Sequence, residues 1–229
     1  MADASWRPIP VNYTANGQTE VRGVVVHIMA GTLPGTDSWF RNPQARASSH
    51  FGTGKAGQLY QWVDTKDRAW AQAAGNSSWI SVENEGKGGD VLTDKQLDKN
   101  ALVLAWSHQL YSVPLQVASG PSGRGLGWHA MGGSAWGGHT ACPGPKIVAQ
   151  LPEIVRRAKN VIEEDIMPSA EEIAKAVWNY RLTSPTAEKG SDPTRSAGTF
   201  QRWGDQHHED VMERLAALED AVKRLGGQK

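Results

Sequence analysis

One short segment, residues 23–28 (GVVVHI), restricts the fold of this chain more than any other. Three consecutive β-branched residues favour an extended strand that lies inside a sheet. His27 stands near the end of this apolar run. We therefore expect a central strand that carries an imidazole to the edge of a sheet.

Further segments alternate between strand-like and helix-like patterns. Residues 48–51 and 58–63 straddle a group of glycines and predict a hairpin, and residues 79–84 (WISVEN) predict another strand. A capping box at residues 93–96 (TDKQ) predicts the start of a helix. Strands interleaved with helices indicate an α/β domain.

The last third of this domain is expected to be less regular. Residues 119–138 are rich in glycine and predict a long loop, which leads to Cys142 in the sequence CPGP. Residues 145–164 carry apolar side chains at helical spacing and predict a closing helix.

The composition of the chain changes near residue 166. We predict a first domain over residues 1–166, followed by a polar, helical C-terminal region over residues 167–229, in which residues 182–198 form a linker. Apolar residues then recur in steps of four and three, as in two heptads of a coiled coil. They are Val211, Leu215, Leu218, Val222 and Leu225. So short a seam is compatible with folding back on the first domain, but we favour a homo-oligomer formed through this helix.

Charge and cysteine content narrow the classes of function. The 24 Lys and Arg residues balance 24 Asp and Glu residues, which argues against bulk electrostatic binding to nucleic acid or to an anionic membrane. The single cysteine excludes an internal disulfide and a zinc module of four cysteines. No run approaches the roughly 18 apolar residues of a membrane span, so we expect no membrane insertion.

The potential metal ligands are a strand histidine and a group in the later loop. His27 ends the first strand, and His129, His139 and Cys142 follow in the segment GWHAMGGSAWGGHTACPG. Two histidines and one cysteine leave one position of a tetrahedral Zn²⁺ open, as in catalytic zinc sites. The spacing alone is weak evidence, because a lone strand histidine is more often a hydrogen-bonded core residue.

Glu83 is the candidate general base. It falls in the strand-like segment next to apolar Val82, at the edge of the expected core. Metal-assisted hydrolysis uses such a carboxylate, because a metal lowers the pKa of water and the carboxylate takes up the proton. An exposed glutamate at a strand end is the commoner situation and remains the alternative.

Four features in this order resemble the type 2 N-acetylmuramoyl-L-alanine amidases, the zinc amidase family that includes phage endolysins and peptidoglycan recognition proteins. They are the strand ending in His27, the sequence SHF at residues 49–51, ISVENEG at residues 80–86, and HTACPG at residues 139–144. The resemblance covers roughly residues 22–161. It implies a central mixed β-sheet flanked by helices.

The resemblance also implies roles for individual residues. His27 and Cys142 match the first and last Zn²⁺ ligands, Glu83 matches the catalytic glutamate, and Thr140 matches the residue that helps to stabilise the oxyanion. Family members that only recognise peptidoglycan typically lack the cysteine, so Cys142 favours an enzyme.

The second histidine ligand departs from the family pattern. It usually precedes the cysteine by eight to ten residues, whereas here His129 precedes it by 13 and His139 by three. An insertion in a Gly-rich loop is easily tolerated, so we favour His129 and expect His139 to line the cleft beside Thr140. Ser49 is a second departure, because many members carry a tyrosine there that helps to activate water.

These residues predict zinc-dependent hydrolysis of the amide bond between N-acetylmuramic acid and L-alanine in peptidoglycan, in a phage endolysin. A peptidoglycan-binding module without turnover is the alternative. A third hypothesis makes Cys142 a thiol nucleophile with His129 or His139 as its base.

The first residues of the chain contain no basic segment followed by an apolar one, so we expect no Sec signal. Synthesis in the host cytoplasm and release to the wall after a holin opens the membrane would follow. Four tryptophans are candidates to contact sugar or peptide, although most of them are expected in the core. They are Trp70, Trp79, Trp128 and Trp136.

Overall fold

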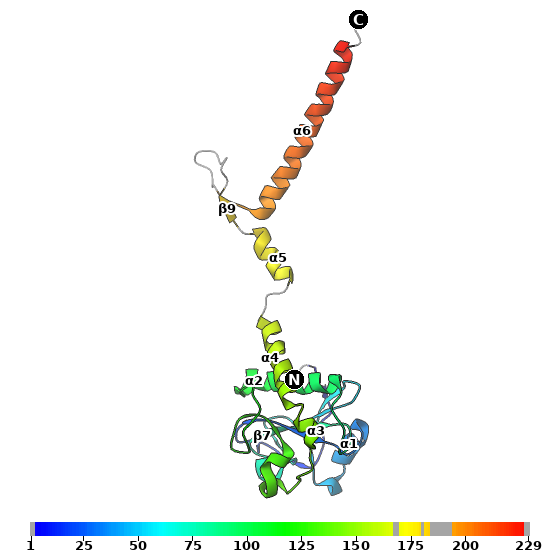
Figure 1. The fold of residues 1–229 in the computed structure, drawn as a ribbon, viewed down its shortest axis with the longest axis vertical. Coiled ribbons are helices and arrows are strands. Elements are labelled where there is room, and N and C mark those ends of the chain that lie inside the picture. Colours follow the sequence, from blue (N-terminus) through cyan, green and yellow to red (C-terminus); the bar gives the residue numbers. More distant parts are fainter. Residues whose placement is uncertain (1–2, 167–169, 180, 184–193, 227–229) are drawn as a thin grey trace. The chain divides into compact units, whose positions relative to one another are not determined.

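The computed structural model describes residues 3–166, 170–179, 181–183 and 194–226 (Figure 1). The chain divides into two compact units, Met1–Ile166 and Met167–Lys229, which are described separately below. No helix in the described ranges has both the length and the apolar character needed to cross a bilayer.

The first unit is built around a six-stranded mixed sheet. In spatial order its strands are β1 (Ser5–Trp6), β5 (Leu59–Gln61), β4 (Phe51–Thr53), β7 (Trp79–Asn84), β3 (Gly23–Ile28) and β8 (Gly125–Trp128). The four strands from β4 to β8 are parallel to one another, and β5 is antiparallel to β4 and parallel to β1. The prediction of a central mixed β-sheet flanked by helices is confirmed.

Of the six strands of the sheet, two have the predicted bounds, and β4 and β5 form the predicted hairpin, with β4 shifted from residues 48–51 to residues 51–53. β1 and β8 were not predicted. The segments 23–28 and 79–84 form β3 and β7, whereas β8 lies in what the sequence predicts to be a loop. The reason is steric. A Cβ atom at Gly23 would collide with the carbonyl oxygen of Gly125, and a Cβ atom at Gly125 would collide with the carbonyl oxygen of Gln116, so close packing and not strand propensity selects both glycines.

One face of the sheet is covered by α2 (Asp94–Tyr111) and α4 (Leu151–Ile166). The capping box at the start of α2 is present, with Thr93 and Gln96 each bonding the backbone of the other. The predicted closing helix is divided into α3 (Pro145–Val148) and α4. Alternate residues of the central strands meet these helices in one buried core, and burying each such side chain contributes about 1.5–3 kcal/mol. The core includes Val24, Val26, Ile80 and Val82 from the strands, Leu104 from α2 and Ile154 from α4.

Smaller elements surround the sheet. They are β2 (Tyr13–Thr14), which pairs with β6 (Arg68–Ala69), α1 (Leu33–Phe40), and the 3₁₀ turns η1 (Pro43–Ala45), η2 (Ala73–Gly75) and η3 (His129–Trp136). The opposite face of the sheet is covered in part by η3, whose Trp136 packs edge to face on Trp79 with ring centroids 5.8 Å apart.

The second unit contains α5 (Ala170–Asn179), the antiparallel strands β9 (Arg181–Thr183) and β10 (Thr194–Ser196), and α6 (Ala197–Gly226). These two short strands occur where the sequence predicts a linker, of which residues 184–193 lie outside the described residues. The apolar seam lies on α6, where Val211, Leu215 and Leu218 are 40, 49 and 62% exposed. The side chains of Val222 and Leu225 lie outside the described residues.

A buried carboxylate joins the N-terminal segment to α1. Asp37 accepts hydrogen bonds from Arg7 at 2.8 and 3.0 Å, from Arg41 at 3.2 and 3.3 Å, and from the indole of Trp62 at 2.8 Å. The bonds from Arg7 and Arg41 hold the pKa of Asp37 well below its ordinary value, against the effect of burial.

We expect Asp37→Ala to lower the free energy of unfolding by about 2–3 kcal/mol, because it removes charged hydrogen bonds and leaves a buried indole N–H unpaired. The depressed pKa means that this stabilisation is complete above about pH 4 and is lost as the pH falls further. Urea unfolding at neutral pH and an acid titration measure both effects, with the exposed Glu163→Ala as control. Coincident acid transitions in the variant and the wild type would contradict this assignment.

Candidate metal centre

The register of three parallel strands aligns the candidate residues. β3 pairs with β7 so that His27 lies beside Glu83. β3 also pairs with β8, and the last pair in this register is Val26 with Trp128. The residues that follow on the two segments, His27 and His129, therefore also lie beside each other. Residues in register on parallel strands point to the same face. The three side chains therefore form a row at the carboxyl end of the sheet, on the face opposite α2 and α4.

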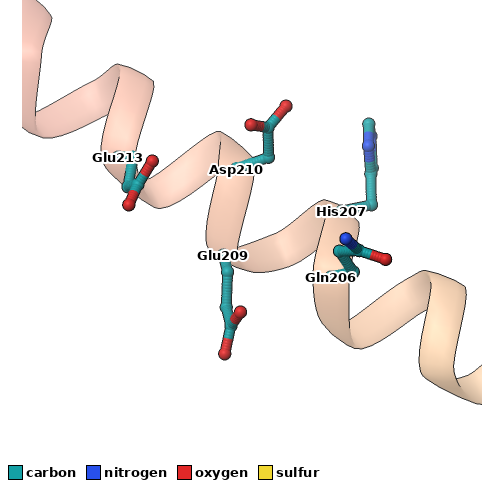
Figure 2. Close-up of a pocket in the computed structure, with 5 residues that line it drawn as sticks. All are labelled: Gln206, His207, Glu209, Asp210 and Glu213. Carbon is teal, nitrogen blue, oxygen red and sulfur yellow. The ribbon is translucent and has the colours of Figure 1, made fainter.

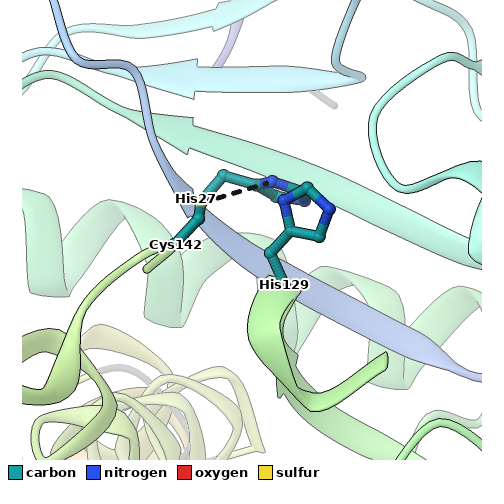
Figure 3. A group of neighbouring side chains, drawn as sticks. All are labelled: His27, His129 and Cys142. Carbon is teal, nitrogen blue, oxygen red and sulfur yellow. Dashed lines mark hydrogen bonds between the residues drawn. The ribbon is translucent and has the colours of Figure 1, made fainter. Parts of the chain in front are cut away.

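His27, His129 and Cys142 each bring one potential ligand atom to within 4.8 Å of the others. Figure 3 shows His27 on β3, His129 at the start of η3, and Cys142 approaching from the loop that follows. The Sγ atom of Cys142 lies 3.9 Å from His27 Nδ1, and the two imidazole centroids are 4.5 Å apart. Both histidines are buried and Cys142 is half-buried.

The outer nitrogen of each imidazole already has a partner. His129 Nε2 lies 2.9 Å from the carbonyl oxygen of Trp136, and His27 Nε2 lies 3.2 Å from Gln72 Oε1. Gln72 is itself buried at the start of η2. Nδ1 is therefore the nitrogen of each ring that remains for a metal.

Backbone hydrogen bonds hold the Cys142 loop to the start of η3. The N–H of Ala130 donates to the carbonyl of Cys142 at 2.9 Å, and the N–H of Cys142 donates to the carbonyl of His139 at 3.1 Å. The His139 ring is exposed and packs against His129, with centroids 4.8 Å apart. His139 thus lies beside the ligand group and not within it. Thr140, the next residue, is also exposed.

Glu83 has an uncompensated carboxylate. Its Oε1 lies 3.9 Å from His27 Nδ1, and its Oε2 is buried with no hydrogen-bond partner among the described residues. Burial raises the pKa of Glu83 to about 8. An unpaired buried carboxylate is unfavourable unless a cation lies nearby, which is the situation that a metal beside His27 would create.

The protonation states of the ligand group also suit a metal. Burial lowers the pKa of His27 well below 6.5 and lowers that of His129, so both rings are neutral and able to coordinate. Burial and the neighbouring Glu83 raise the pKa of the Cys142 thiol to about 12. Metal binding would therefore be coupled to loss of the thiol proton. Two imidazoles, one thiolate and a nearby carboxylate fit Zn²⁺ with one open position.

Sequence reasoning missed Gln72, because a single glutamine in an irregular segment carries no recognisable pattern. His50, in the sequence SHF at residues 49–51, lies outside the ligand group. The His50 side chain bonds Ser81 and the carbonyl of Asp67, inside the unit, so it supports the strands and does not enter the ligand group. Ser49 is likewise buried and bonds Ser81 Oγ at 3.0 Å.

The tryptophans divide into buried and partly buried residues. Trp79 and Trp136 are 0 and 3% exposed, whereas Trp70 and Trp128 are partly buried. The most exposed tryptophan of the first unit is Trp6, at 55%.

Polar side chains on α6 do not form a second centre. Figure 2 shows Gln206, His207, Glu209, Asp210 and Glu213 along one stretch of a single helix. Glu209 and Asp210 project in different directions, since adjacent helical residues are about 100° apart. In the part of the chain that the structure describes, only His27, His129 and Cys142 bring three such ligands together.

The fold and the ligand group define an α/β protein with a candidate metal centre at the carboxyl end of its sheet. Residues 17–145, more than half of the chain, match the sequence profile of the N-acetylmuramoyl-L-alanine amidase family (Amidase_2). The chain belongs to this family, and the resemblance predicted from its motifs is confirmed. N-acetylmuramoyl-L-alanine amidase A of Achromobacter lyticus is 32% identical over 89 residues, which are 38% of this chain and 50% of the relative. The match thus spans half the length of that relative.

Solved structures share the fold at low sequence identity. The Staphylococcus aureus hydrolase AmiA superposes with a TM-score of 0.54 at 17% identity, over 73% of this chain and 87% of AmiA. AmpD gives a TM-score of 0.53 at 21% identity, over 68% of this chain and 95% of AmpD. The PlyG catalytic domain gives 0.50 at 19% identity, over 72% of this chain and 99% of that domain.

We expect Glu83→Gln to stabilise the metal-free protein at neutral and alkaline pH. Burial raises the pKa of Glu83 from 4.5 to about 8, so ionisation above pH 4.5 opposes folding, whereas a neutral amide does not ionise. The gain should be absent below pH 4.5 and should reach roughly 2–4 kcal/mol near pH 8.

Urea unfolding of chelator-treated protein across this pH range measures the effect. Glu85→Gln is the matched control, because the Glu85 carboxylate, unlike Glu83 Oε2, accepts a hydrogen bond from the N–H of Lys55. This substitution should not stabilise the protein. Equal stabilities of wild type and Glu83→Gln near pH 8 would show that the carboxylate is not destabilised by burial.

Proposed function

We propose that this chain is a zinc-dependent N-acetylmuramoyl-L-alanine amidase, which hydrolyses the amide bond between N-acetylmuramic acid and L-alanine in peptidoglycan. Membership of the family supports the choice of substrate. The observation that carries the proposal is the buried Glu83 carboxylate, whose Oε2 has no hydrogen-bond partner among the described residues, beside the group of His27, His129 and Cys142. A protein that only binds peptidoglycan has no need for this destabilised base.

The proposed chemistry assigns a task to each residue. His27, His129 and Cys142 would hold Zn²⁺, which when bound supplies Lewis-acid polarisation of the scissile carbonyl and of water. Glu83 takes a proton from the attacking water and passes it to the departing amine of L-alanine. The exposed hydroxyl of Thr140, close in sequence to Cys142, donates a hydrogen bond to the developing oxyanion.

The environment of Cys142 does not favour the hypothesis of a thiol nucleophile. A nucleophilic cysteine needs a lowered pKa, usually from a neighbouring cation or a helix N-terminus. Here burial and the neighbouring Glu83 raise the pKa of the thiol to about 12. This shift suits a ligand that loses its proton only to a metal.

We expect hydrolysis of purified cell walls to release new L-alanine amino termini, to stop on addition of a chelator and to resume on addition of Zn²⁺. Glu83→Gln should lower kcat by about 10²–10⁴-fold, because the proton acceptor is lost, while zinc content stays unchanged. Amino-terminal labelling and metal analysis give the two readouts.

Binding to walls without release of amino termini would indicate a recognition module and overturn the catalytic assignments. Cleavage that resists chelators and is blocked by a thiol reagent would favour Cys142 as a nucleophile.

The biological role in this proposal is that of a phage endolysin, made in the host cytoplasm and admitted to the wall when a holin opens the membrane. The helical region after Ile166 supports this role, because an enzyme of intracellular wall recycling has less use for such an extension.

The partner that we propose for α6 is the same helix in a second copy of the chain. Val211, Leu215 and Leu218 lie at d, a and d positions and are exposed. In a parallel pair, Arg214 at a g position would face Glu219 at the next e position of the other copy, with opposite charge. Charge and apolar spacing therefore favour the same arrangement.

We expect the protein to sediment as a dimer at high concentration and Leu218→Glu to return it to a monomer, because a charge would enter the apolar seam. Arg214→Glu should weaken the dimer by placing like charges together, and adding Glu219→Arg should restore it. Analytical ultracentrifugation distinguishes these outcomes. A wild-type protein that stays monomeric at all concentrations would refute the pairing.

A further inference from the structure

Both histidines of the ligand group face a hydrogen-bond acceptor with the nitrogen that points away from Cys142. The acceptor for His129 is the carbonyl oxygen of Trp136, 2.9 Å from Nε2. A carbonyl oxygen can only accept, so His129 Nε2 carries the proton. Its Nδ1 therefore has a free lone pair when the ring is neutral.

The acceptor for His27 is the side-chain amide of Gln72, and its orientation is fixed by its other contacts. Gln72 Nε2 lies 3.4 Å from the carbonyl oxygen of Gly75 and 3.3 Å from that of Trp79. Two acceptors at these positions require the NH₂ group of the amide there. Oε1 must then face His27 Nε2 at 3.2 Å, so this nitrogen also carries the proton.

Gln72 is held firmly in this orientation. Its side chain is 1% exposed, and its backbone N–H donates to Asn76 Oδ1 at 2.6 Å. Its Nε2 contacts with the carbonyl groups of Gly75 and Trp79 both depend on the present rotamer. This arrangement differs from a surface glutamine that meets a histidine by chance.

The two acceptors belong to one packed unit. A Cβ atom at Gly75 would lie 2.6 Å from the Trp136 ring and 2.9 Å from Gln72 Cγ, so only glycine allows the η2 turn to approach both. Trp136 in turn packs on Trp79, whose carbonyl holds the Gln72 amide. A displacement of the Trp136 ring would therefore disturb the acceptors of both imidazoles.

We propose that Gln72 is a positioning residue that, together with the carbonyl of Trp136, fixes both histidines in the Nε2–H tautomer before a metal arrives. The Nδ1 lone pairs of both rings are thereby presented to the position next to Cys142. The identity of the metal as zinc rests on the proposed function, whereas the tautomers are a property of the metal-free protein.

The first test is the tautomer of His27 in metal-free protein. Nitrogen-15 NMR of the imidazole resonances should show both His27 and His129 as the Nε2–H form in the wild type. In Gln72→Leu, which keeps the approximate volume but removes the acceptor, His27 should shift towards a mixture of tautomers while His129 keeps its form. An unchanged His27 in the folded variant would overturn the proposal.

The second test is the affinity for Zn²⁺, measured by competition with a chromophoric chelator. Loss of an outer hydrogen-bond partner of a metal-binding histidine typically weakens binding by about 10–100-fold, and we expect this for Gln72→Leu. Gln61→Leu is the matched control, since Gln61 is a buried glutamine on β5 that donates to the carbonyl of Val63. Its affinity should stay at the wild-type value.

A conservative variant separates positioning from packing. Gln72→Glu keeps an oxygen that accepts from His27 but loses the donors to Gly75 and Trp79, so it should lower thermal stability while preserving the His27 tautomer and most of the zinc affinity. Equal weakening of zinc binding by Gln72→Leu and Gln61→Leu would show a general loosening of the fold and overturn the proposal. A wild-type protein that binds no zinc but shows the expected tautomers would refute the zinc assignment and leave the positioning role intact.

Discussion

The parallel pairing of β3 with β7 and β8 is the constraint on which the candidate centre depends. The register that places His27 beside Glu83 also places His129 one step beyond the end of β8. Because a shift of one residue would turn every side chain to the other face, the same register that buries Val24 and Val26 under α2 and α4 presents His27 on the opposite face. Core packing and the metal centre are therefore set by the same register.

The centre opposes the stability that this packing provides. Burial raises the pKa of Glu83 and lowers the pKa of His27 and of His129, so charging any of the three groups disfavours folding of the metal-free chain. The surrounding structure compensates with rigid contacts, among them the Asn84 amide, which donates to the carbonyl of His27 at 3.0 Å and accepts from Thr53 at 2.6 Å. A local conflict of this kind, held in place by a consistent fold, is typical of a functional site.

The sequence predicted what depends on local pattern and missed what depends on packing. The β-branched run of β3 and the capping box of α2 are recognisable from local sequence. The candidate residues His27, Glu83 and Cys142 were chosen from the order of their motifs along the chain. β8 was not predicted because its two glycines are selected by the close approach of Gln116 to Gly125 and of Met131 to Gly127, and not by strand propensity. Gln72 was not predicted because its contact with His27 forms only when η2 is folded against β7.

The long segment between His129 and Cys142 brings together residues that spacing alone could not place. Its first residues form η3, after which the chain turns back so that the N–H of Ala130 donates to the carbonyl of Cys142 despite their separation in sequence. The same segment contains Trp136, whose ring packs edge to face on Trp79 and whose carbonyl accepts a hydrogen bond from His129. This segment is therefore part of the candidate centre, because it contains both His129 and the carbonyl group that accepts from it. A deletion that included Trp136 would remove that acceptor together with part of the cover of the sheet.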